Sequence, residues 1–161
     1  MHYGERFHLN YYKAYIFRSN LHNFQEKMLS PRTKANIKKY RKGRISDHFK
    51  PRGGSCNFGT FGLQSKSAGL FTSRQIEATR KVLKKHLKKR GRLWLNVFPD
   101  VAKTKKPEKT RMGKGKGRTH LWCFKVHPGK ILFEIGGLSL KNARIIFKKA
   151  SYKLPFFTRS V

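Results

Sequence analysis

Hydrophobic positions recur at helical spacing between residues 72 and 90. Apolar side chains three or four positions apart form one stripe of an amphipathic helix. The stripe consists of Ile76, Leu83 and Leu87, widened by Thr79 and Val82. Thr72 followed three positions later by Gln75 fits a capping box, and Gly91 fits the glycine that ends a helix. We therefore predict a helix that begins after Thr72 and ends near Arg90.

A second helical pattern covers about residues 140 to 153. One face of this predicted helix is apolar and would pack on a core. It carries Ala143, Ile146, Phe147 and Ala150, with Leu154 just beyond the predicted end.

Other stretches alternate in the manner of strands. Residues 57–63 alternate small and aromatic side chains, which suits a strand that another backbone approaches closely. Residues 92–98 also alternate, and Pro99 and Asp100 end them. Residues 120–126 and 130–135 are two more strands around a Pro-Gly turn, and 155–161 allow a short final strand. The pattern predicts an α+β fold, a small mixed or antiparallel sheet with two packed helices.

Composition divides the chain into three parts. Residues 1–27 are rich in Tyr, Phe, Asn and His and form an N-terminal extension that we expect to pack on a neighbouring protein. Residues 28–54 form a basic arm, and residues 55–161 form the α+β domain. Within that domain we predict a long polar loop over residues 101–119, of a length that is usually functional or disordered.

Net charge narrows the class of function. The 161 residues carry 39 Lys and Arg against 7 Asp and Glu, a formal charge of +32. Such a field opposes compaction and attracts polyanions, and each phosphate contact releases counterions. Nucleic acid is therefore the expected partner, and part of the chain is expected to order only against it. No apolar run approaches the roughly 18 residues that span a bilayer, so we expect no membrane association.

Two basic segments are candidates for phosphate contact. The arm has two interpretations, a solvated tail or an extended segment threaded between RNA helices, and we favour the second. On the first predicted helix the single acid, Glu77, cannot neutralise the basic face, so we expect that face to bind phosphates. The candidate residues for RNA binding are Arg32, Lys34, Lys38, Lys39, Arg41, Lys42, Arg44 and Arg52 in the arm and Arg74, Lys81, Lys84, Lys85 and Lys88 on the helix.

A glycine-lysine segment is the most specific feature of the chain. It consists of Arg111, Met112, Gly113, Lys114, Gly115, Lys116 and Gly117. Glycines permit positive φ and close approach to another surface, while the cations supply charge for an anionic partner. A phosphate-binding P-loop requires a second glycine five positions after the first, and counting from Gly113 this position is Arg118.

Catalytic and metal-binding patterns are weak. Glu77 and Glu134 have no local carboxylate partner, and His120 and His127 accompany no nucleophile motif. Cys56 and Cys123 form no C-x-x-C pair, so we expect no metal, no cofactor and no enzymatic activity. Several aromatic side chains allow either base stacking or core packing, of which core packing is commoner at strand spacing. They are Trp94, Phe98, Trp122 and Phe124, with Phe58 and Phe61 more ambiguous.

Six motifs occur in order along residues 28–161: MLSPRTK at 28–34, FGTFGL at 58–63, TSRQIEATR at 72–80, WLNVFPD at 94–100, RMGKGKG at 111–117 and PGK at 128–130. Together they resemble the bacterial and organellar large-subunit ribosomal protein sixteen family. The resemblance implies a compact α+β fold with a β-hammerhead element. It also implies binding to large-subunit rRNA, with residues 111–117 directed toward the peptidyl-transferase region and the A- and P-site tRNAs.

Departures from the family leave alternatives open. The 27-residue extension, and the basic and aromatic character of residues 145–149, favour a mitochondrial ribosome over a plastid or bacterial one. We expect neighbouring ribosomal proteins as partners and no homo-oligomer. The alternative function is a free-standing basic RNA chaperone, and an RNA-modifying enzyme would need a cofactor pocket that the sequence does not indicate.

Overall fold

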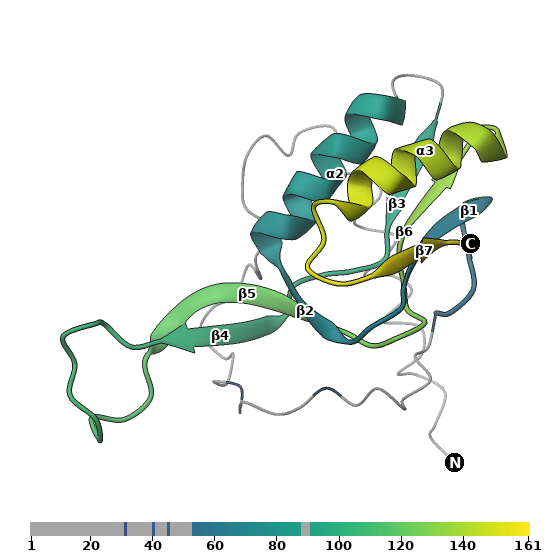
Figure 1. The fold of residues 1–161 in the computed structure, drawn as a ribbon. Coiled ribbons are helices and arrows are strands. Elements are labelled where there is room, and N and C mark those ends of the chain that lie inside the picture. Colours follow the sequence, from purple (N-terminus) through teal and green to yellow (C-terminus); the bar gives the residue numbers. More distant parts are fainter. Residues whose placement is uncertain (1–30, 32–39, 41–44, 46–52, 88–90) are drawn as a thin grey trace, which may run out of the picture.

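The computed structural model describes Pro31, Tyr40 and Ile45 together with residues 53–87 and 91–161. The predicted extension and most of the predicted arm lie outside these residues. Across the described part, two helices and seven strands form two antiparallel sheets (Figure 1). This arrangement confirms the predicted α+β class.

The larger sheet has the strand order β3-β6-β1-β7. β6 (Ile131–Gly136) is buried along its whole length, and it pairs with β1 (Phe61–Ser65) and β3 (Arg92–Leu95). β7 (Thr158–Ser160), the short final strand that the sequence allowed, adds to the free edge of β1. The two helices pack together over one face of this sheet (Figure 1).

The smaller sheet has the order β2-β5-β4. β2 (Gly69–Thr72) pairs with the C-terminal half of the long β5 (Arg118–Val126), and β4 (Val101–Lys105) pairs along β5 as a hairpin. Phe71 of β2 joins this sheet to the core, because its ring meets the ring of Phe133 edge to face at 6.2 Å. The hairpin therefore grows out of the packed core.

The first helix, α2 (Ser73–Leu87), begins as predicted. The Thr72 amide donates to Gln75 Oε1 at 3.0 Å and the Gln75 amide donates to Thr72 Oγ1 at 3.3 Å, which is a complete capping box. The apolar stripe is confirmed, since Ile76, Thr79 and Leu83 are fully buried. The described helix ends at Leu87, and the predicted end near Arg90 lies outside the described residues.

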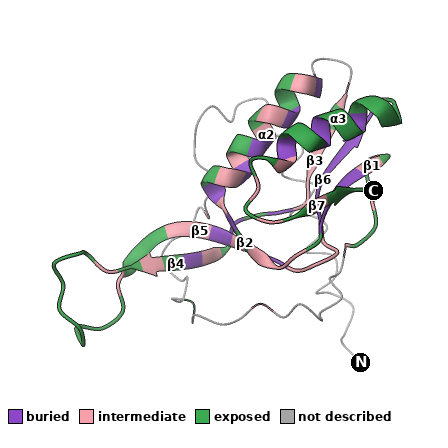
Figure 2. Ribbon diagram, in the orientation of Figure 1, coloured by how far each residue is buried: buried purple, intermediate pink, exposed green. Residues whose placement is uncertain are grey.

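The second helix, α3 (Leu140–Ser151), also carries the predicted core face. Its four apolar residues Ala143, Ile146, Phe147 and Ala150 are buried, and Leu154 packs half-buried just after the helix. Full burial of an Ile or Phe side chain stabilises the folded state by about 1.5–3 kcal/mol. Figure 2 shows the buried positions of both helices facing each other and the sheet.

Several boundaries differ from the sequence prediction. The predicted loop over residues 101–119 is too long, because β4 occupies its first five residues and β5 begins at Arg118. The true loop runs from 106 to 117. Of the β4 side chains only Ala102 is buried, so the strand is held by backbone pairing that side-chain patterning does not reveal. Similarly, β3 ends at Leu95, and the Asn96 amide donates instead to the Leu132 carbonyl at 3.0 Å.

The predicted strand over residues 57–63 begins only at Phe61, because the preceding residues bend around the carboxylate of Glu134. The amides of Phe58 and Gly59 donate to Glu134 Oε2 at 2.7 and 2.8 Å, and the amide of Asn57 donates to both oxygens. Asn96 Nδ2 donates to the other carboxylate oxygen, Oε1. The predicted close approach is confirmed at Gly59, where a Cβ would lie 2.8 Å from the Ile135 carbonyl oxygen.

This cage keeps Glu134 charged although the residue is fully buried. Burial alone raises the pKa of a carboxyl group, but the four donors favour the carboxylate and together hold the pKa of Glu134 below its ordinary value. A carboxyl with a lowered folded-state pKa stabilises the protein above its unfolded pKa of about 4.3, and this stabilisation is lost as the pH falls through the folded value.

We predict that Glu134→Ala lowers the free energy of unfolding by about 3 kcal/mol or more, because it removes the shared acceptor of four donors and opens a cavity at a fully buried position. Glu134→Gln keeps the volume and one acceptor and should cost roughly 1–3 kcal/mol. Chemical denaturation at pH 7 measures both.

The pH dependence provides a second readout. The wild type should lose stability more steeply than Glu134→Gln as the pH falls below about 4.3, because only the wild type must protonate this carboxylate. Glu108→Gln, at an exposed position of the loop, is the matched control and should change stability by less than about 0.5 kcal/mol. Equal acid sensitivity in wild type and Glu134→Gln would contradict the account.

Candidate nucleic-acid interface

The hairpin of β4 and β5 projects well beyond the packed core, and its loop lies at the far end (Figure 1). Figure 2 shows this loop exposed almost throughout. Arg111 to Lys116 are all exposed, and Met112 is 93% exposed although it is a large apolar residue. An exposed loop at the end of a hairpin is accessible to another molecule.

Glycine is required at three positions of this loop for two different physical reasons. Gly113 and Gly115 have φ of 83° and 73°, the left-handed region that L side chains rarely adopt. A Cβ at either position would meet nothing within 4 Å, so backbone conformation alone selects glycine there. At Gly117 a Cβ would lie 2.4 Å from the Lys105 carbonyl oxygen, so here close packing of the two hairpin arms selects glycine.

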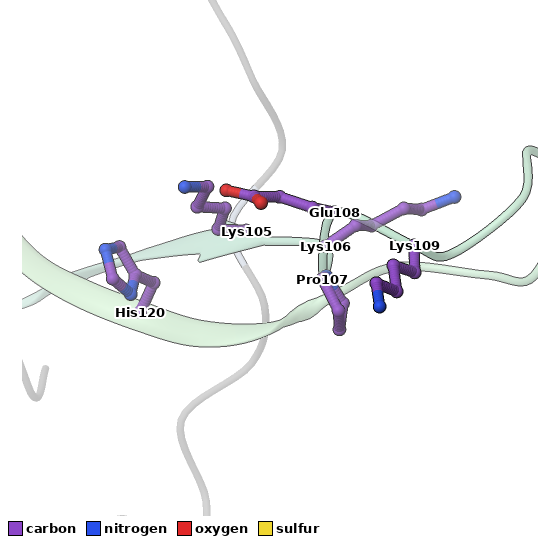
Figure 3. Close-up of a pocket in the computed structure, with 6 residues that line it drawn as sticks. All are labelled: Lys105, Lys106, Pro107, Glu108, Lys109 and His120. Atoms are coloured by element: carbon purple, nitrogen blue, oxygen red, sulfur yellow. The ribbon is translucent and has the colours of Figure 1, made fainter.

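Positive charge is spread around the hairpin. Residues 101–126 contain nine Lys and Arg and one acid, Glu108. Lys105, Lys106 and Lys109 surround a shallow hollow near His120, and their ammonium groups leave the hairpin in different directions (Figure 3). Charges dispersed in this way suit a phosphate backbone that passes along the hairpin better than a single small anion.

The basic face of α2 is largely unneutralised. Between described residues the structure records one ion pair, in which Arg80 binds Glu77 at 2.6 Å. The hydrogen bond from Arg80 lowers the pKa of Glu77 and keeps it ionised. The predicted phosphate-binding residues Arg74, Lys81, Lys84 and Lys85 are exposed, and Lys88 lies outside the described residues.

One described residue of the arm contacts the hairpin. Lys125 of β5 donates to the hydroxyl of Tyr40, and its ammonium lies 3.9 Å from the centre of the Tyr40 ring. Lys116 donates to the Tyr40 backbone carbonyl. The predicted RNA-binding residues of the arm lie outside the described residues and stay a prediction: Arg32, Lys34, Lys38, Lys39, Arg41, Lys42, Arg44 and Arg52.

The aromatic candidates separate by burial. Phe124 packs against the core and Trp94 and Trp122 are half-buried. Phe98 and Phe58 are 39% and 52% exposed, and the backbone of Phe58 is fixed by Glu134. Phe58 is therefore the most accessible of the aromatic rings considered for base stacking.

The structure also locates the candidate metal ligands and thiols. Within the described ranges, no three His, Cys, Asp or Glu side chains are grouped to hold a metal ion. Cys56 and Cys123 are both free thiols, and burial raises the pKa of each, which makes them poor nucleophiles. No helix of the described part is both long enough and apolar enough to cross a membrane.

The fold and this surface define a small, strongly basic α+β protein that presents a Gly/Lys loop on a projecting hairpin. Residues 32–161 match the family described as ribosomal protein L16p/L10e, and the chain belongs to this family. As a member of a ribosomal protein family it is a structural component and not an enzyme.

Relatives of high identity agree with this assignment. The chain is 45% identical over 134 residues to large ribosomal subunit protein uL16 of Rhizorhabdus wittichii, covering 83% of this chain and 92% of the relative. It is 47% identical over 135 residues to uL16 of Cereibacter sphaeroides, covering 83% and 96%. With uL16c of Cyanidium caldarium it shares 47% identity over 128 residues, covering 80% and 90%.

We predict that replacing Arg74, Lys81, Lys84 and Lys85 together by alanine weakens binding to a large-subunit rRNA transcript. Each lost phosphate contact should reduce the slope of log affinity against log salt by roughly 0.7–0.9. The matched control replaces Lys141, Arg144, Lys148 and Lys149, four exposed cations of α3. Equal losses from both sets would show that α2 has no special role in RNA binding.

Proposed function

We propose that this protein is a structural component of the large ribosomal subunit that binds large-subunit rRNA and holds the loop 111–117 near the tRNA-binding and peptidyl-transferase region. The observation that carries the proposal is the exposed, glycine-shaped loop at the end of the projecting hairpin. Membership in the family of ribosomal protein L16p/L10e supports the ribosomal part of the proposal.

Binding to rRNA would use the arm and the basic face of α2. Lys and Arg side chains hold phosphates and fix the position of a protein on RNA without selecting its sequence. The four exposed cations of α2 lie on the side of the helix opposite its buried stripe, so they are accessible while the core stays packed.

Contact with tRNA would use the loop. Its backbone carries no side chain at three of seven positions, which lets it approach a sugar-phosphate surface closely. Arg111 and Lys114 are exposed and supply charge at that approach. The chain would position tRNA and provide no catalytic group, since peptide-bond chemistry in this proposal belongs to the RNA.

The remaining partners follow from the assembly. Neighbouring ribosomal proteins are the proposed contacts of residues 1–27, and a mitochondrial ribosome is the proposed location. The basic and aromatic character of residues 145–149 favours that location. The proteins that co-purify with the chain in intact ribosomes identify the compartment.

We predict that replacing Lys38, Lys39, Arg41 and Lys42 by alanine reduces incorporation into large subunits several-fold, because these residues would anchor the arm on rRNA. Replacing Lys114 and Lys116 should leave incorporation intact and slow tRNA accommodation. Quantitative mass spectrometry of purified subunits measures incorporation, and rapid kinetics with labelled tRNA measures accommodation. Equal assembly loss from both sets would contradict this division between arm and loop.

A further inference from the structure

Tyr40 is held at two points of the hairpin that are nine positions apart in sequence. Its ring and hydroxyl contact the ammonium of Lys125, and its backbone carbonyl accepts from Lys116. These contacts join a residue of the basic arm to residues 76 and 85 positions further along the chain. Through these contacts, side chains of the hairpin bind a described residue of the arm.

The two lysines belong to different parts of the hairpin. Lys125 lies in β5 opposite Leu70 of β2, on the portion that is anchored to the core. Lys116 lies in the loop, two positions before β5 begins. Tyr40 therefore connects the anchored base of the hairpin to its distal loop through one side chain and one carbonyl.

We propose that Tyr40 is a positioning residue that clasps the hairpin and sets the direction in which its loop points. This inference rests on the proposed function, because the direction of the loop matters only where the loop meets a ligand. A cation over an aromatic ring and a charge-assisted hydrogen bond hold the clasp, and the positive field around both lysines favours any nearby π face or carbonyl oxygen.

The clasp divides the two lysines of the glycine-lysine loop by role. The ammonium of Lys116 is engaged with the arm, whereas Lys114 is exposed and has no recorded partner among the described residues. Lys114 and the exposed Arg111 are therefore the cations that bind tRNA phosphate, and Lys116 orients the loop.

The first test measures loop direction in the free full-length protein. Spin labels at Met112→Cys and Lys148→Cys, with Cys56→Ser and Cys123→Ala, report the distance between the loop and α3 by pulsed electron paramagnetic resonance. Tyr40→Ala should increase the population outside the main distance by roughly three- to tenfold, and Tyr40→Phe by less because the ring contact remains. Lys125→Gln should act like Tyr40→Ala.

The control is Tyr152→Ala, which removes another exposed tyrosine at the end of α3 and should leave the distances unchanged. Circular dichroism shows whether each variant retains its fold. An unaltered distance distribution in folded Tyr40→Ala and Lys125→Gln would overturn the clasp.

The second test uses large subunits that contain the variants. Tyr40→Ala and Lys116→Ala should reduce crosslinking of residue 112 to bound tRNA several-fold at full incorporation. Lys114→Ala should slow tRNA accommodation while the loop distances stay at the wild-type values. The division of roles would be overturned if Lys114→Ala and Lys116→Ala had the same effect on the loop distances. Absence of the wild-type protein from ribosomes would instead refute the proposed function, and the first test would still be valid.

Discussion

The buried carboxylate of Glu134 ties the segment before β1 and the segment after β3 to the central strand of the larger sheet. It lies in the central strand β6 and accepts from the backbone of residues 57–59 and from the side chain that follows β3. Three segments that are far apart in sequence therefore meet at one charged group. Because four donors surround it, the charge is tolerated in a site from which water is excluded.

The hairpin is joined directly to the strand that carries Glu134. β5 leads through the turn at residues 127–130 directly into β6, and Phe71 of the smaller sheet packs on Phe133, the neighbour of Glu134. The long, unpacked loop thus extends from a firmly packed base. The net charge of +32 would oppose such compaction, but many of the described cations are exposed on the hairpin, α2 and α3, where a polyanion can neutralise them.

The features that sequence predicted well are local ones. The capping box of Thr72 and Gln75 and the buried stripes of α2 and α3 depend on residues three or four positions apart. The cage around Glu134 cannot be predicted in this way, because its partners lie 38 to 77 positions away and three of them are backbone amides, which every residue except proline carries. β4 is likewise absent from the sequence pattern, since its pairing with β5 is made by the backbone. The contacts of Tyr40 cannot be predicted from the sequence pattern. The glycine-lysine loop, in contrast, is a contiguous motif that the sequence shows directly.

The central claim is that this chain is a fixed component of the large ribosomal subunit. The most direct test is a high-salt wash of ribosomes, followed by gradient separation and quantitative mass spectrometry. We expect one copy of the chain per large subunit after the wash, because phosphate contacts and the folded core would hold it in place. Two results together would contradict this expectation and favour a free-standing RNA chaperone. They are fewer than one copy of the chain per subunit before the wash and release of the chain into the supernatant by the wash.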